Sequence, residues 1–202
     1  EIGVRLVGSE MCIRDRFIAD GEFQQTDATN ENVIIQWRGK TVEEPYIIEV
    51  SKNKQDGYRK VDHIYVDTRN HNICSTYIHD LKPGSSYYVR IYSVDSSGKK
   101  KYSEPLEVVT EPEGKIENLK YEWKKSNSVK LSWDKVSGAN VYKVRYYKDN
   151  DEYIKYTTKN SLTLKNLKKG EGYSTRVEPM RQSESGFHVE SNNAGEGKIY
   201  IE

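Results

Sequence analysis

The sequence predicts an all-β protein built from two consecutive seven-stranded β-sandwich domains. Three observations support this prediction. Short segments alternate between apolar and polar residues, clusters of turn residues separate these segments, and a weak internal repeat runs through residues 17–202. No apolar stripe with helical spacing persists along the chain, and 202 residues suffice for two small domains.

The composition agrees with thin β-domains. Hydrophobic residues make up 35% of the chain, which is adequate because a small sandwich buries only the inward half of each strand. The chain has 16 Tyr against 3 Phe and 3 Trp, and tyrosine suits half-buried strand positions. The formal net charge of +1 gives no basis for nucleic-acid binding, and no apolar run approaches the roughly 20 residues of a membrane span.

The first sixteen residues, EIGVRLVGSEMCIRDR, differ from everything that follows. The segment from Leu6 to Asp15 can be encoded by CTC GTG GGC TCG GAG ATG TGT ATA AGA GAC, which resembles a transposase-type sequencing adapter read in frame. A leader around Cys12 is the alternative, but its apolar stretch is too short for a signal-peptide core. We therefore expect residues 1–16 to be an unfolded artefact, which leaves the true N-terminus and any signal peptide unobservable.

The first anchor of the repeat is a strand that ends in tryptophan. The two copies of this strand are 33–37 and 129–133, and in the second copy buried-type residues alternate with Lys130 and Ser132. A second anchor lies nine residues beyond each tryptophan, where inward-type residues again occupy every second position. These residues are Tyr46, Ile48 and Val50 in one copy and Tyr142, Val144 and Tyr146 in the other.

The third anchor is a leucine, a glycine-containing turn and a tyrosine six residues after the leucine. It reads LKPGSSY at 81–87 and LKKGEGY at 167–173. This layout is typical of a tyrosine corner, in which the hydroxyl bonds an upstream backbone group and fixes the crossover between two sheets. The predicted structural residues are therefore Trp37, Trp133, Leu81, Tyr87, Leu167 and Tyr173.

A short linker separates the two copies. Pro112 cannot donate to a β-ladder and Gly114 relaxes the backbone, so we predict a first domain at 17–111, a linker at 112–114 and a second domain at 115–202. A linker this short predicts modules with limited bending freedom.

The tryptophan, the Leu–Gly–Tyr corner and the Tyr102–Pro105 entry to a last strand together resemble the fibronectin type III family. The second copy is similar to a W-x-x-V-x-G-A-x-x-Y-x-V variant, at 133–144, that is common in bacterial surface and secreted proteins. The first copy matches more loosely: Pro45 precedes its third strand, and extra length falls within about residues 52–73. The resemblance implies immunoglobulin-like sandwiches that serve as spacers or adhesion modules, and it does not by itself imply a ligand.

Residues with catalytic or metal-binding chemistry show no motif. His63, His71, His79 and His188 lack metal spacing, and His79 is expected to be a solvated strand residue. Cys74 is expected to be a buried structural thiol. The 149–152 segment could offer oxygens to calcium, but a solvated hairpin turn is the favoured interpretation. We expect no catalytic, cofactor or metal site.

The candidate binding surface is the outward side of the second domain's third strand. Tyr142 and Tyr146 share the core face with Val144, so Tyr147 lies on the opposite face with Lys143 and Arg145. An exposed tyrosine flanked by cations could stack on a sugar ring or anchor a protein partner. The alternative is a sheet face covered by cross-strand Tyr–Lys pairs.

These expectations favour a non-catalytic spacer or adhesion segment of a larger bacterial cell-surface or secreted protein. Its partners would be neighbouring domains of the same polypeptide, with weak protein or carbohydrate contacts, no nucleic acid and no membrane insertion within the fragment. Two alternatives stay open: the accessory region of a secreted hydrolase whose catalytic domain lies outside the fragment, and a cytokine-receptor-like pair that binds its ligand at the inter-module elbow.

Overall fold

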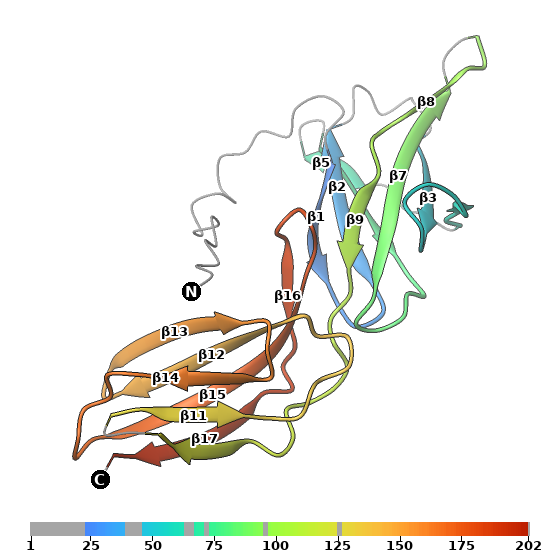
Figure 1. The fold of residues 1–202 in the computed structure, drawn as a ribbon. Coiled ribbons are helices and arrows are strands. Elements are labelled where there is room, and N and C mark those ends of the chain that lie inside the picture. Colours follow the sequence, from blue (N-terminus) through green and yellow to red (C-terminus); the bar gives the residue numbers. More distant parts are fainter. Residues whose placement is uncertain are drawn as a thin grey trace. The chain divides into compact units, whose positions relative to one another are not determined.

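The computed structural model describes residues 23–38, 46–62, 67–70, 73–94, 97–124 and 127–201. All regular structure in these ranges is β-strand. The chain divides into two compact units, Glu1–Thr110 with Ser183–Val189 and Glu111–Gln182 with Glu190–Glu202. We call the β-sandwiches before and after the division at Thr110 the first and second modules (Figure 1). The predicted all-β class with tandem sandwiches is confirmed. The predictions for residues 1–16, and for Pro45, His63 and His71, fall outside the described residues.

The first module consists of two antiparallel sheets. One sheet has the order β1-β2-β6-β5, with β1 (Phe23–Ala28), β2 (Val33–Arg38), β6 (Ile73–Ile78) and β5 (Asp67–Asn70). The other has the order β4-β3-β7-β8, with β4 (Arg59–Lys60), β3 (Ile47–Ser51), β7 (Ser86–Val94) and β8 (Lys100–Tyr102). A further strand, β9 (Leu106–Val109), also pairs with β7.

The core of the first module lies between these two sheets. Alternate residues of β2 and β7, one strand from each sheet, are buried against each other, which explains the period of two in their sequences. They are Val33, Ile35 and Trp37 on β2 and Tyr87, Val89 and Ile91 on β7, none of them more than 7% exposed.

The last strand of the first module is interrupted. β8 pairs with the far half of β7 and β9 with its near half, and Pro105 lies in the gap because it has no N–H to give to a ladder. Ser103 bridges the interruption: its N–H donates to the Ile91 carbonyl (2.8 Å), and its hydroxyl accepts from the Ile91 N–H (3.0 Å). The strand thus bends at Pro105 without leaving Ile91 unpaired.

The second module repeats this arrangement. One sheet has the order β10-β11-β14, with β10 (Lys120–Trp123), β11 (Val129–Ser132) and β14 (Ser161–Leu164). The other has the order β13-β12-β15-β16, with β13 (Asp151–Thr157), β12 (Val141–Lys148), β15 (Gly172–Gln182) and β16 (His188–Glu190), and β17 (Gly195–Tyr200) also pairs with β15. Figure 1 shows the two sheets as facing layers.

The modules differ in one edge strand. When β16 and β17 are counted as one interrupted strand along β15, the second module has the predicted seven strands. The first module has an additional strand, β5, next to β6. Strand β5 lies in the region where the first copy of the repeat carries extra length, so part of that length adds an edge strand.

The 133–144 motif of the second module forms a closed turn before β12. Gly138 has a φ of 80°, which glycine adopts without strain, and the Ala139 N–H donates to the Val136 carbonyl (3.2 Å). The buried Tyr142 hydroxyl accepts a hydrogen bond from the Val136 N–H (3.0 Å). The glycine and the tyrosine of the motif therefore each have a local structural reason.

Each module also ties its first strand to the opposite sheet. In the first module the buried Gln25 amide on β1 donates from Nε2 to the Val109 carbonyl (2.7 Å) and accepts from the Val109 N–H through Oε1 (2.9 Å). In the second, the Tyr121 hydroxyl on β10 lies 2.8 Å from Thr175 Oγ1 on β15. A Cβ at Gly197 would lie 2.1 Å from that hydroxyl oxygen, so only glycine fits there.

Candidate functional site

Both predicted tyrosine corners have a hydrogen bond from the tyrosine hydroxyl to the upstream backbone. The Lys82 N–H donates to the Tyr87 hydroxyl (2.7 Å), and the Lys168 N–H donates to the Tyr173 hydroxyl (3.0 Å). The leucines that begin the two turns, Leu81 and Leu167, are both buried. In both modules the bond spans five residues and ties a sheet crossover to the strand that follows it.

The two predicted tryptophans are buried in equivalent positions. Trp37 packs edge-on against Tyr46 at a ring-centroid distance of 5.6 Å, and Trp133 packs edge-on against Tyr142 at 5.2 Å. Each buried indole Nε1 lacks a hydrogen-bond partner, so these tryptophans contribute by apolar packing. The Cys74 thiol is also buried, and its residue pairs directly with Trp37 across β2 and β6.

The predicted binding residues Lys143, Arg145 and Tyr147 share the outer face of β12, opposite the core residues of that strand. Each has a cross-strand partner on either side. On β15 the partners are Glu178 for Lys143, Arg176 for Arg145 and Ser174 for Tyr147, and on β13 they are Tyr156, Ile154 and Glu152 in the same order. The register therefore puts two arginines directly opposite each other, and like charges in that position need carboxylates around them.

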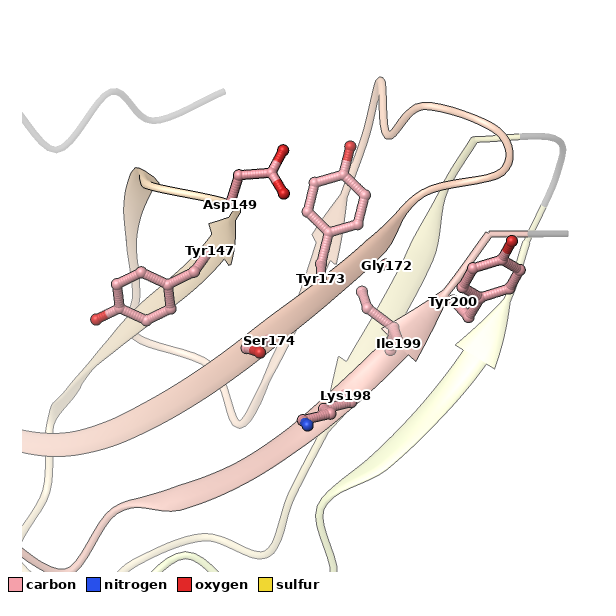
Figure 2. Close-up of a pocket in the computed structure, with 8 residues that line it drawn as sticks. All are labelled: Tyr147, Asp149, Gly172, Tyr173, Ser174, Lys198, Ile199 and Tyr200. Carbon is pink, nitrogen blue, oxygen red and sulfur yellow. The ribbon is translucent and has the colours of Figure 1, made fainter.

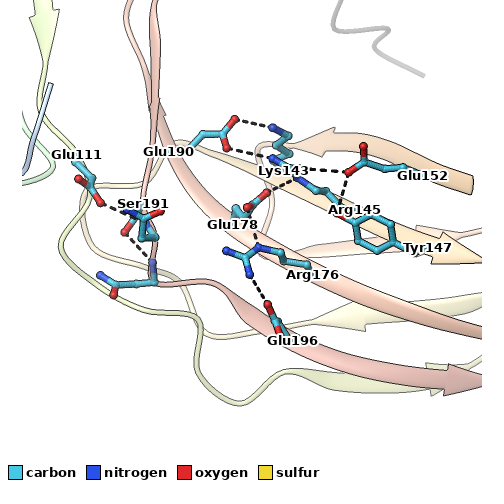
Figure 3. A network of polar contacts seen from close by, with 12 residues as sticks. Glu111, Lys143, Arg145, Tyr147, Glu152, Arg176, Glu178, Glu190, Ser191 and Glu196 are labelled. Carbon is cyan, nitrogen blue, oxygen red and sulfur yellow. Dashed lines mark hydrogen bonds and ion pairs between the residues drawn. The ribbon is translucent and has the colours of Figure 1, made fainter. Parts of the chain in front are cut away.

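Glutamates from four strands supply these carboxylates (Figure 3). The almost completely buried Glu178 lies between the arginines, accepting from Arg145 Nε (2.8 Å) through Oε2 and from Arg176 Nε (2.9 Å) through Oε1. Glu190 pairs with Lys143 Nζ (2.7 Å) and with Arg145 Nη2 (3.5 Å). The remaining pairs are Arg145 Nη1 to Glu152 (3.3 Å) and Arg176 to Glu196.

This network corrects the expectation of a tyrosine beside available cations. The side chains Lys143, Arg145 and Arg176 meet the carboxylates of Glu152, Glu178, Glu190 and Glu196, so the formal charge of the network is 3 − 4 = −1. Tyr147 is not an available donor, since its hydroxyl donates to Glu152 Oε1 (2.8 Å). Ion pairs between cations and glutamates cover the sheet face, and the alternative of cross-strand Tyr–Lys pairs fits the register at Lys143, whose partner on β13 is Tyr156.

The electrostatics of Arg145 reflect its enclosed position. Partial burial acts to lower the pKa of its guanidinium, but the hydrogen bond with Tyr147 and the charge of Glu178 outweigh burial and raise the pKa overall. Arg145 therefore keeps its charge throughout the physiological range. Its N–H groups donate to the carboxylates of Glu152, Glu178 and Glu190. Arg145 on β12 is thus linked to β13, β15 and β16, and these charge-assisted hydrogen bonds hold the four strands together.

A shallow hollow of about 380 Å³ lies beside the network on the same sheet face (Figure 2). Tyr147 and Tyr200 flank it, Gly172 and Ser174 line it on β15, and Lys198 enters it from β17. Lys198 makes no ion pair within the described part of the chain, unlike the cations of the network. Sequence reasoning missed Lys198 and Tyr200, although their alternation with the buried Ile199 was a usable signal.

The other candidate residues have structural surroundings. His79 is exposed just after β6, stacked on Tyr77 at 5.9 Å, with Nδ1 2.9 Å from the Asn32 side-chain oxygen. His188 is exposed on β16, and Asp149 (φ 52°) forms the β12–β13 turn. Among the described residues, no three His, Cys, Asp or Glu side chains are grouped so that they could hold a metal ion.

A protein-family model for the fibronectin type III domain matches residues 21–109 and again residues 114–194. The chain belongs to the fibronectin type III family. Domains of this family are generally non-catalytic structural or binding modules, typically of extracellular or cell-surface proteins. Within the described residues, no helix has the length and apolar character needed to cross a bilayer.

Two solved tandem segments are similar to this chain. A two-domain fibronectin type III segment of chicken tenascin is 16% identical, with a TM-score of 0.45, and the match covers 89% of this chain and 97% of that one. The FN1–FN3 domains of chicken CNTN1 are 18% identical, with a TM-score of 0.47, covering 89% of this chain and 66% of that one. No curated protein sequence matches the chain.

Proposed function

We propose that the chain is a non-catalytic spacer and adhesion segment of a larger bacterial cell-surface or secreted protein. The observation that carries this proposal is the path of the backbone through each module. The chain enters at one end of each sandwich and leaves at the other, so that every module adds its length between the segments that flank it.

The second module shows this path most directly. The Ile116 N–H, at the entry, donates to the Asn193 carbonyl (3.1 Å), which lies just before β17. The Ile201 N–H, at the exit, donates to the Glu171 carbonyl (2.9 Å) beyond the other end of β17. The six residues of β17 lie between these points and extend over about 20 Å at roughly 3.3 Å per residue.

The first module has the same polarity. Its first strand begins at Phe23 and runs to the β1–β2 turn, where the Glu31 carbonyl accepts a hydrogen bond from the Leu81 N–H (3.0 Å). This turn therefore lies beside the tyrosine corner. The chain leaves the module at the same end, where the Thr110 N–H donates to the Ser85 carbonyl (3.0 Å).

Pulling on the two ends of the chain in a single-molecule force experiment tests the spacer role. We expect two separate unfolding events, each releasing on the order of 30 nm, because a module of this size has that extended length at roughly 3.6 Å per residue. A single event for the whole chain, or extension without any resolved resistance, would contradict the proposal.

The bacterial origin rests on the similarity of residues 133–144 to the bacterial variant of the family. Sequencing the source DNA on both sides of this reading frame tests it. Bacterial genes around the frame and further surface or wall-binding modules in the same polypeptide are the expected result. An adjoining hydrolase domain would instead favour the accessory-region alternative.

A further inference from the structure

The first module holds its cations in a different way from the second. Four of its cations lie over tyrosine rings. Lys52 Nζ lies 3.5 Å from the Tyr87 ring centroid, Lys54 Nζ 6.0 Å from that of Tyr88, and Lys100 Nζ 4.5 Å from that of Tyr92. The Arg90 guanidinium lies between two rings, 3.9 Å from Tyr58 and 4.4 Å from Tyr102. No comparable cation–ring contact occurs in the described part of the second module.

Most of these contacts form one continuous row on the outer face of the β4-β3-β7-β8 sheet. Along β7, Arg90 and Tyr92 point away from the core, whose residues alternate with them. The cross-strand partner of Tyr92 on β8 is Tyr102, with ring centroids 4.9 Å apart. The row therefore runs Tyr58, Arg90, Tyr102, Tyr92, Lys100, and we call it the tyrosine–cation row.

A ring that holds a cation leaves its charge in place, whereas a carboxylate cancels it. Arg90 has one carboxylate partner, Glu49, at 2.6 Å. Lys60, the cross-strand partner of Glu49, has no ion pair within the described residues, and neither does Lys100. The Tyr92 hydroxyl, which hydrogen-bonds the Lys100 ammonium, raises the pKa of that group, so Lys100 is fully charged at neutral pH.

The two modules thus differ in formal charge on equivalent sheet faces. The first has Lys54, Lys60, Arg90 and Lys100 with Glu49 and Glu107, a formal charge of 4 − 2 = +2. The corresponding face of the second module has the three cations and four carboxylates of the network together with Lys198, a formal charge of 4 − 4 = 0. The excess of cations on its face favours anion binding by the first module.

We propose that the tyrosine–cation row of the first module binds an acidic polysaccharide. The carboxylates of the glycan would pair with Lys60 and Lys100, and its sugar rings would lie against Tyr58 and the exposed Tyr102. The face is open and spans four strands, about 15 Å at roughly 4.8 Å per strand spacing, which suits an extended chain better than a small compact ligand. This role goes beyond that of a spacer and does not depend on it.

Titration calorimetry with polygalacturonate, a polymer of uronic acid, tests the proposal on the full chain. Neutral dextran and single-stranded poly(dT) serve as comparison ligands. We expect binding to polygalacturonate at low salt that weakens as salt is added, no binding to dextran and weaker binding to poly(dT). Absence of polygalacturonate binding at low salt overturns the proposal, as does tighter binding to poly(dT), which would assign the face to nucleic acid.

Two double variants with the same change in net charge locate the site. The variant Lys60→Ala with Lys100→Ala removes two exposed cations of the face. The variant Lys120→Ala with Lys159→Ala removes two exposed lysines of the second module that form no ion pair with any described residue. We expect the first pair to weaken polygalacturonate binding by on the order of tenfold and the second by less than about twofold. Equal losses in both pairs would mean that the row is not the site.

The single variant Tyr102→Leu separates ring contact from charge, because it leaves every cation in place. We expect it to weaken polygalacturonate binding by about threefold or more, with the salt dependence unchanged. Unchanged affinity would overturn the assignment of sugar rings to this tyrosine. Failure of these tests would leave the two-step force extension intact, so the binding role and the spacer role fail independently.

Discussion

Replacing Gln25 by Leu should destabilise the first module by about 2–4 kcal/mol. The substitution removes both hydrogen bonds to Val109, each worth about 1 kcal/mol net, and it leaves the N–H and carbonyl of Val109 without partners. Val109 is completely buried, so water cannot replace the lost partners, and the cost should lie in the upper half of that range. The exposed neighbour Gln24 provides the matched control, since Gln24→Leu should change stability by less than about 0.5 kcal/mol.

Hydrogen exchange measured by mass spectrometry, on peptides that cover β1, β7 and β9, reports on this module within the full chain. We expect the Gln25→Leu variant to lose protection at the Val109 amide, with smaller losses along β7, and urea unfolding to give the free-energy change. A variant Gln25→Glu adds a pH test. Its carboxylate faces the Val109 carbonyl at neutral pH, and burial raises its pKa above the unfolded value, so stability should recover as pH falls. Unchanged Val109 protection in Gln25→Leu would refute the reasoning.

Three further predictions concern other parts of the chain. Tyr87→Phe and Tyr173→Phe should each destabilise their own module by about 1 kcal/mol, because each removes one corner hydrogen bond. Urea unfolding measures this change, and unfolding of both variants like that of the parent would contradict the prediction. Glu178→Ala should lower the free energy of unfolding by about 2 kcal/mol, because two facing arginines lose their shared carboxylate. The control Glu196→Ala, at an exposed position, should lower it by less than about 1 kcal/mol. Equal shifts of the melting temperature in the two variants would argue against the network. Deleting residues 1–16 should leave calorimetric unfolding unchanged, and a loss of cooperativity would show that the segment belongs to the fold.

The parts of the fold that depend on local sequence could be predicted. The period of two in β12 correctly placed Tyr142, Val144 and Tyr146 in the core, because side-chain direction in a strand depends only on neighbouring residues. The Leu–Gly–Tyr spacing indicated both turns, because a corner closes over five residues.

The candidate site was harder to predict because it depends on register between distant strands. Arg145 meets Glu190, which lies 45 residues away, only because β12, β15 and β16 are adjacent in one sheet. The same holds for Gln25 and Val109, which are 84 residues apart. The sequence shows that Tyr147 lies beside two cations, but not that glutamates from neighbouring strands neutralise them.

The interrupted last strand of the first module also affects how the protein behaves at high concentration. Strands β8 and β9 form an edge of their sheet, and an unbroken edge strand is a template on which another chain can add. Pro105 removes a donor in the middle of this edge, and Lys100 and Lys101 add charge to its first half. An array of such modules on a crowded surface would therefore resist edge-to-edge aggregation between neighbouring copies.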